Sequence, residues 1–377
     1  MTTQHSSPKN LDIEVLRAYA ISITLVAHLG VLHPDWYRWT SYFWLGGGVD
    51  LFFAISGFLI TATLLKAFST GQSFRMIAGT FWVRRLFRLW PAALTWSTLT
   101  LLLTLGFDVS RTFGPEQAMF DSWLYGALNL QNLHIWSVGN SGGVATPLWH
   151  YWSLSLEEQF YLLLPIVLAL VTNRKALIIP VIMIALYQSI QIRPWGTLLW
   201  FIRSDALLLG VAIALAWHYY ADRVSSLFKT LGKKTVTVVF VLSLPLPIVL
   251  ANANWFSFYM GLVAISAGAV VFIASANSNL SEPAGRLQEL AIYLGSRSYS
   301  IYLIHNPMFA LTRELCLNSG LTDLTSTAAR LGALAIALVM TILLAECSFR
   351  IIENPLRHYG ATLSKRLTDK AGEAVTS

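Results

Sequence analysis

The sequence predicts an all-α membrane protein, a polytopic bundle of about ten transmembrane helices with both termini in the cytoplasm. Of its 377 residues, 55% are hydrophobic and only 12% are charged, and the mean hydropathy is +0.58. A soluble domain usually has about twice that charged fraction. Two cysteines are too few for a disulfide framework, and the eight histidines show no H-E-x-x-H spacing. We therefore expect no metal site.

Ten apolar runs are long enough to cross a bilayer, which takes roughly 20 residues. They lie near residues 11–32, 46–67, 83–106, 148–171, 175–192, 196–218, 234–252, 256–276, 292–315 and 324–346. No internal repeat divides the chain, so we expect a single membrane domain over residues 1–377. Its other segments are a cytoplasmic tail at 1–10, an outer loop at about 107–146 that could cover an acceptor site, and a disordered cytoplasmic tail at 360–377.

The distribution of basic residues gives the orientation. With the N-terminus inside, nineteen of the 26 Lys and Arg residues fall on the cytoplasmic side and five on the outer side, while Arg17 and Arg203 lie within spans. Basic residues accumulate on the cytoplasmic side of membrane proteins. The net charge of +7 therefore reflects orientation in the bilayer, and we expect no nucleic-acid partner.

The first span contains two ionisable residues, Arg17 and His28. An ionisable group in hydrocarbon costs about 2.5 kcal/mol or more, which makes each one a functional candidate. Eleven residues are about three helical turns, so both side chains lie on one face, roughly 16 Å apart along the axis. The structural alternatives are an ion pair of Arg17 with Glu14 and a hydrogen-bonded histidine between helices for His28.

Two carboxylates could orient the His28 ring. Asp50 enters the second span at about the depth where His28 leaves the first, although an acid also suits a helix N-terminus. Glu157 in the fourth span is the other candidate. Ser56, also in the second span, belongs to a run of small residues that lets helices approach closely.

Arg84, Arg85 and Arg88 cluster at the predicted start of the third span. The helix dipole is already positive there, so three guanidinium groups would build a strong site for phosphates. The alternative is an anchor to anionic lipid headgroups.

Two later spans carry further candidates. Arg203 and Asp205 lie in the sixth span, where an internal ion pair is the structural alternative. Tyr302 and His305 lie in the ninth span. His305 is either a second buried site residue or support for a kink at Pro307.

Taken together, these segments resemble the acyltransferase-3 family of membrane O-acyltransferases. The matching pieces follow one another in the family's order: Leu11 to His28, Gly48 to Ile60, Phe81 to Pro91, Trp152 to Tyr161, Arg203 to Gly210 and Ser298 to Pro307. The resemblance covers most of the chain rather than one motif.

The resemblance implies transfer of an acyl group, usually acetyl from cytoplasmic acetyl-CoA, to a hydroxyl. His28 matches the family's essential histidine, Arg17 its partner arginine, and Arg85 with Arg88 the pair associated with the acyl donor. Longer members carry an extracytoplasmic esterase-like domain, which we do not expect in this protein. We therefore expect a surface carbohydrate such as O-antigen or exopolysaccharide as acceptor, rather than peptidoglycan, and a location in the inner membrane.

The resulting hypothesis places the CoA phosphates on Arg84, Arg85 and Arg88, with Arg17 along the arm. His28 then takes the proton of the acceptor hydroxyl, which attacks the thioester; a covalent acyl-enzyme relay fits the same residues. The rival interpretations are an ion-coupled transporter or exporter of a small polar or lipid-linked solute and a non-catalytic scaffold for glycan assembly. Transporters tend to show repeated halves, and none is visible here.

Overall fold

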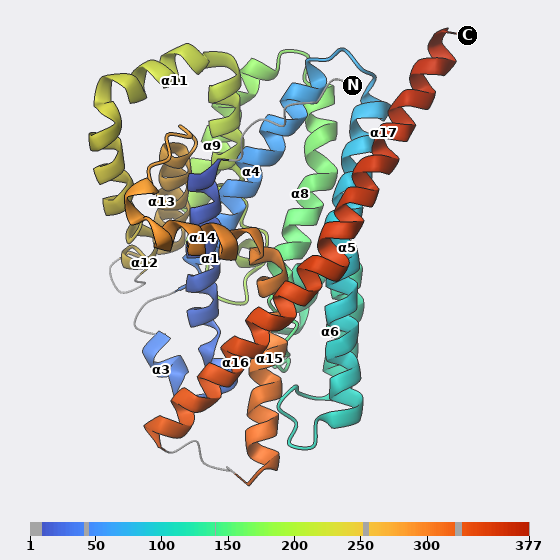
Figure 1. The fold of residues 1–377 in the computed structure, drawn as a ribbon, viewed down its shortest axis with the longest axis vertical. Helices are drawn as coiled ribbons and strands as arrows, with labels where there is room; N and C mark the ends of the chain where they lie inside the picture. The colour runs from blue at the N-terminus through green and yellow to red at the C-terminus, as the bar shows by residue number, and fades with distance from the viewer. Residues whose placement is uncertain (1–9, 41–44, 140, 252–255, 321–325, 377) are drawn as a thin grey trace.

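The computed structural model describes residues 10–40, 45–139, 141–251, 256–320 and 326–376, and every regular element in these ranges is a helix (Figure 1). The elements are α1 (Leu11–Ala27), α2 (Leu29–Leu32), α3 (Trp36–Thr40), α4 (Gly47–Phe68), α5 (Phe74–Phe107), α6 (Glu116–Ala127), α7 (Gln131–Gly139), α8 (Tyr151–Leu170), η1 (Arg174–Leu177), α9 (Ile178–Ser189), α10 (Leu198–Phe201), α11 (Asp205–Ser243), α12 (Leu246–Val249), α13 (Tyr259–Ala274), η2 (Glu282–Ala284), α14 (Arg286–Ser296), α15 (Ser298–Asn318), α16 (Thr327–Ser348), η3 (Phe349–Glu353) and α17 (Asn354–Thr376). The tail predicted at 1–10 lies, except for Asn10, outside the described residues.

Six helical segments are long and apolar enough to cross a membrane. They are Leu11–Leu32, Gly47–Phe68, Phe74–Phe107, Tyr151–Leu170, Asp205–Val249 and Thr327–Asp369. The all-α fold is thus confirmed, and the chain is a multi-pass membrane protein. Helices α9, α13 and α15 match three further predicted spans but are shorter or less apolar. The count of ten spans and the cytoplasmic termini stay predictions.

Helix α11 covers two of the predicted spans in one bent element. Its backbone leaves helical geometry at Tyr220 and at Gly232, where φ is +74°. Glycine adopts such a φ without the steric cost that a Cβ would bring. The helix turns back over one end of the molecule (Figure 1). The break therefore falls between the predicted spans at 196–218 and 234–252.

The predicted outer loop and the predicted C-terminal tail both contain helices. The loop at 107–146 contains α6 and α7. The tail at 360–377, predicted to be disordered, continues α17 as far as Thr376. This helix lies along α5, where the Tyr359 ring meets the Phe87 ring at 5.1 Å and Arg84 Nε donates to Ser364 Oγ. Packing on a neighbouring helix explains the order that composition alone did not predict.

Helix α4 lies at the centre of the bundle, packed against α1, α8, α11 and α13. Its closest approach is to α11 and depends on two glycines. A Cβ on Gly57 would meet the backbone oxygen of Leu207, and a Cβ on Gly210 would meet that of Ala54. Small residues of this kind let helices in a membrane touch backbone to backbone. This packing holds the polar residues of α4 in the interior.

Candidate active site

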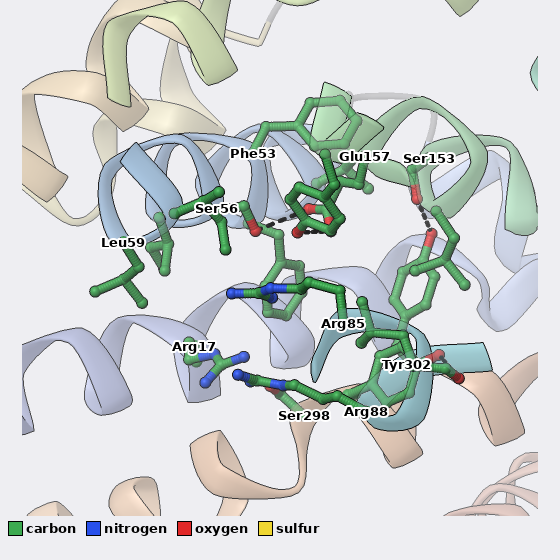
Figure 2. Close-up of a pocket in the computed structure, with 18 residues that line it drawn as sticks. Arg17, Phe53, Ser56, Leu59, Arg85, Arg88, Ser153, Glu157, Ser298 and Tyr302 are labelled. Atoms are coloured by element: carbon green, nitrogen blue, oxygen red, sulfur yellow. Dashed lines mark hydrogen bonds between the residues drawn. The ribbon is translucent and has the colours of Figure 1, made fainter. Parts of the chain in front are cut away.

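Two adjoining cavities in the bundle collect most of the residues that the sequence singles out. The first, which we call the arginine cavity, contains about 710 Å³ of space not filled by atoms. Side chains from α1, α4, α5, α8 and α15 line it (Figure 2). Its polar lining includes Arg17, Ser56, Arg85, Arg88, Glu157 and Tyr302.

The second, which we call the histidine cavity, contains about 1450 Å³ of such space. His28, at the break between α1 and α2, lines it together with His150, which precedes α8. Val49 of α4 and Tyr302 of α15 line both cavities. The arginines and the histidines therefore lie on two sides of one shared boundary.

The guanidinium groups of Arg17, Arg85 and Arg88 point toward one another across the arginine cavity (Figure 2). Arg17 Nη1 lies 3.5 Å from Glu14 Oε1, so the predicted ion pair exists alongside the placement in the cavity. The Arg85 guanidinium lies 5.0 Å from the centre of the Tyr161 ring. No described residue forms a hydrogen bond or ion pair with Arg85 or Arg88. Guanidinium groups whose N–H donors are not taken up by a carboxylate suit phosphate oxygens.

Arg84, predicted to share the phosphate site, lies outside the cavity. It is exposed on α5, and its Nε donates to Ser364 Oγ of α17 at 2.6 Å. The predicted helix start is also wrong, because α5 begins at Phe74 with the Ser73 side chain as its N-cap. The arginines thus lie several turns into the helix, beyond the reach of the terminal dipole, and the cavity depends on the guanidinium charges themselves.

Glu157 is hydrogen-bonded inside the arginine cavity. Ser56 Oγ donates to Glu157 Oε1 at 3.1 Å, and the Tyr161 hydroxyl donates to Oε2 at 2.8 Å. Both carboxylate oxygens are therefore engaged between α4 and α8. The structure does not bring Glu157 to His28.

Three histidines meet on the other side of the boundary. His305 Nε2 lies 3.2 Å from His28 Nδ1, and the His150 ring centre lies 5.0 Å from that of His305. No group of three His, Cys, Asp or Glu side chains in the described part of the chain could hold a metal ion. The hydrogen bonds within the cluster therefore indicate what the three histidines can do.

Those hydrogen bonds assign the tautomer of His28. His305 Nδ1 lies 2.7 Å from the Tyr302 carbonyl oxygen, which can only accept, so this nitrogen carries the proton and His305 Nε2 is an acceptor. His28 Nδ1 faces that acceptor and, at 2.9 Å, the carbonyl oxygen of Thr24. It must therefore be the donor to both. His28 Nε2 is left with its lone pair, as a general base requires.

Asp50, the other predicted partner of His28, pairs with an arginine instead. Arg203 Nη2 lies 3.5 Å from Asp50 Oδ2, and both side chains are buried. Asp205, predicted to pair with Arg203, receives Arg193 Nη2 at 2.6 Å. Asp50 thus pairs with an arginine 153 positions away in the sequence. Asp205 pairs with Arg193 rather than with the predicted Arg203. Asp50 does lie in the first turn of α4, the alternative that the sequence left open.

His150 is the site residue that sequence reasoning missed. It stands in a run of aromatic residues at the start of the fourth predicted span and is not among the predicted site residues. In the structure it is buried, its Nδ1 lies 2.8 Å from the Pro147 carbonyl oxygen, and the Asn306 amide contacts the same nitrogen at 3.2 Å. A polar ring at the edge of an apolar span was the available signal.

Comparison with known proteins adds a family relationship. Residues 10–346 match the family described as an acyltransferase domain, Acyl_transf_3. The chain is 29% identical to the peptidoglycan O-acetyltransferase OatA of Listeria monocytogenes over 95% of its length. It is also 29% identical to the O-acetyltransferase OatA of Staphylococcus aureus over 97% of its length. A putative peptidoglycan O-acetyltransferase of Bacillus subtilis, YrhL, is 29% identical over 92%.

These relatives are longer proteins. The chain spans 57% of the Listeria protein, 60% of the Staphylococcus protein and 55% of the Bacillus protein. No solved structure of another protein matches it.

Proposed function

This chain belongs to the acyltransferase-3 family, and on that premise we propose that it is a membrane O-acetyltransferase. In this proposal an acetyl group passes from acetyl-CoA to a hydroxyl of a glycan. The observation that supports it most strongly is the shared boundary of the two cavities at Val49 and Tyr302. A cationic pocket for a donor and a histidine pocket for an acceptor adjoin there, as a two-substrate transfer requires.

The arginine cavity would hold the donor. Arg17, Arg85 and Arg88 supply three positive charges for phosphate oxygens. Apolar residues such as Phe53 and Leu59 line the same cavity and suit an uncharged arm leading away from the phosphates. The thioester would then reach the boundary at Tyr302.

The histidine cavity would activate the acceptor. His28 Nε2 takes the proton of the acceptor hydroxyl, whose oxygen forms a bond to the thioester carbonyl carbon. The carbon–sulfur bond then breaks, the acetyl ester remains on the acceptor, and the proton passes from His28 to the departing CoA sulfur. A positioned base typically contributes about 10²–10⁴-fold to such a step.

The acceptor is proposed at the level of a glycan hydroxyl. Two of the relatives carry peptidoglycan in their names, whereas the sequence argument favoured O-antigen or exopolysaccharide. Deleting the gene and measuring alkali-labile acetyl esters on each polysaccharide fraction separates these acceptors. The inner membrane as the location is part of the same proposal.

Purified protein tests the donor half. Arg85→Ala and Arg88→Ala should each weaken acetyl-CoA binding by about 10–100-fold, as expected for charge-assisted hydrogen bonds. Arg84→Ala is the matched control on the same helix and should bind within about twofold of the wild type. Acetyl-CoA should raise the melting temperature of the wild type, because a ligand stabilises the state that binds it.

The acceptor half is tested by His28→Ala, which should bind acetyl-CoA normally but transfer acetyl at least about 10²-fold more slowly. Normal transfer in this variant, or no effect of acetyl-CoA on the wild type, would overturn the proposal.

A further inference from the structure

Four tryptophans form one wall of the histidine cavity. Trp149 lies just before α8 and Trp152 lies in its first turn, whereas Trp195 precedes α10 and Trp200 lies within it. Trp195 bridges the two pairs, with its ring centre 6.4 Å from that of Trp149 in a stacked arrangement and 4.5 Å from that of Trp200. Trp200 in turn lies 4.9 Å from Trp152. The four indoles therefore form one continuous cluster.

This wall differs from the aromatic belt of a membrane protein, in which rings lie at the lipid headgroups. Trp152 and Trp200 are only 8% and 6% exposed, whereas Trp195 is 56% exposed. Two rings thus lie inside the bundle and one at its rim. Such a gradient leads from the surface into the cavity.

Polar groups lie beside the wall. The Arg203 guanidinium lies 4.5 Å from the Trp152 ring centre and 4.6 Å from that of Trp200, and it lines the cavity. Nε2 of His150 and one amide atom of Asn306 are buried without a hydrogen-bond partner among the described residues. Both residues line the cavity, and buried polar atoms normally have partners, so a hydroxyl that reached either atom would supply the missing one.

An indole wall with a guanidinium group over two of its rings and further polar groups nearby fits one chemical class well. A pyranose ring has a face of C–H groups, which carry slight positive charge and stack on the negative face of an aromatic ring. Its hydroxyls project from the edge and can both donate and accept hydrogen bonds. A lipid tail would leave the buried polar atoms unpaired, and a small anion would not use the indoles.

We propose that the wall of Trp149, Trp152, Trp195 and Trp200 is the subsite that stacks a sugar ring of the acceptor. The same cavity contains His28, so a ring on this wall presents a hydroxyl toward the base. The inference rests on the proposed function for its role in acetyl transfer. The binding of a sugar ring itself can be measured without the reaction.

The binding test uses the full chain in nanodiscs free of glycoside detergents. The probes are neutral oligosaccharides of glucose, mannose, galactose or N-acetylglucosamine, detected by saturation-transfer NMR without acetyl-CoA. We expect at least one to bind. Trp195→Ala should weaken that binding roughly tenfold, the upper end of what one aromatic contact contributes, and Trp195→Phe should restore much of it. Trp90→Ala, an exposed tryptophan on α5 outside both cavities, should bind like the wild type.

Steady-state kinetics of acetyl transfer give a second test. Trp195→Ala should raise the KM for the acceptor with little change in kcat, because stacking holds substrate and transition state alike. The acetyl-CoA-dependent rise in melting temperature should be the same in all three variants.

The outcomes separate the subsite from the proposed function. No binding of any probe, equal binding by Trp195→Ala, or displacement of the probe by short-chain phosphatidylcholine would overturn the subsite, even where acetyl-CoA still stabilises the protein. If oligosaccharide binding depends on Trp195 but acetyl-CoA does not stabilise the protein, the subsite is supported and the proposed function is overturned.

Discussion

The His28 side chain has one nitrogen free for chemistry because the other is held from two directions. Its Nδ1 donates to the Thr24 carbonyl oxygen at 2.9 Å and faces His305 Nε2 at 3.2 Å. His305 is held in turn by the Tyr302 carbonyl oxygen. A neighbouring imidazole therefore does here what a carboxylate does in many histidine sites, which is to fix the tautomer and the ring orientation.

This arrangement makes His305 a positioning residue. His305→Gln keeps an oxygen that can accept from His28 Nδ1, whereas His305→Ala removes the acceptor. We expect kcat to fall about tenfold in the alanine variant and less in the glutamine variant, with acetyl-CoA binding unchanged in both. The expected loss is smaller than that for His28→Ala, because Thr24 still holds the ring. Equal kcat in all three proteins would show that His305 serves packing alone.

Asp50 and Arg203 form a buried ion pair, with each side chain 1% exposed. Removing one partner of such a pair leaves an uncompensated charge and typically costs about 3–5 kcal/mol. Asp50→Ala should therefore lower the melting temperature strongly, and the double variant Asp50→Leu with Arg203→Met should recover part of the loss.

The control is the exposed pair of Lys233 and Glu282, whose side chains are 55% and 60% exposed. Lys233→Ala should leave the melting temperature nearly unchanged, because exposed ion pairs contribute little to stability. If Asp50→Ala is as stable as Lys233→Ala in thermal unfolding, the buried pair does not stabilise the fold.

Among the helices, α4 contributes the most residues to the lining of the arginine cavity. Its backbone-to-backbone contact with α11 holds these residues in place. Gly57→Ala would place a methyl group against the Leu207 carbonyl oxygen, so the helices must separate. Overpacking of this kind costs about 1–3 kcal/mol, and the separation should also disturb the adjacent Ser56 to Glu157 hydrogen bond. We expect a lower melting temperature and weaker acetyl-CoA binding.

Gly79→Ala in α5 is the matched control. A Cβ there meets nothing within 4 Å, and alanine favours a helix over glycine by about 0.5–1 kcal/mol. This variant should be as stable as the wild type or more so. A melting temperature that falls equally in both variants would contradict the role of the α4 to α11 contact.

Periodicity predicted the helical elements better than their ends. The predicted third span lies within α5, but the helix begins earlier, at Phe74, since Ser73 caps it. The arginines were therefore assigned to a helix start that lies elsewhere. Arg84 instead donates a hydrogen bond to Ser364 of α17, and a partner more than 250 positions away in the sequence leaves no local signal.

Across the whole molecule, the relative positions of residues on one helix could be predicted from their spacing in the sequence. The ion pairs and contacts between helices could not. The eleven-residue interval predicted that Arg17 and His28 lie toward different depths of one face, and each lines one of the two cavities. The partners of Asp50 and Asp205 could not be predicted, since buried charges combine with whichever opposite charge the packing brings near. His150 and Asn306 contact each other only where the start of α8 meets α15, so their pairing could not be predicted from the sequence.

Because Val49 lines both cavities, substituting it tests whether the acetyl group passes directly from one cavity to the other. Val49 lines both cavities and is 7% exposed, so a larger side chain there should fill the boundary without touching the arginines or the indole wall. Val49→Phe should leave acetyl-CoA binding and oligosaccharide binding within about twofold, because each site keeps its own contacts. Transfer should fall by 10²-fold or more, since misplacement by about 1 Å between reacting groups can cost that much.

Two variants make this result specific. Val49→Ala enlarges the boundary and should transfer at a rate close to the wild type, while Val26→Phe adds the same bulk at an exposed position of α1 and should change nothing. Because both binding sites are measured in the same protein, a loss of transfer alone locates the block between them. Normal transfer by Val49→Phe would mean that the acetyl group crosses elsewhere, and the shared boundary would then be a feature of packing rather than of the reaction path.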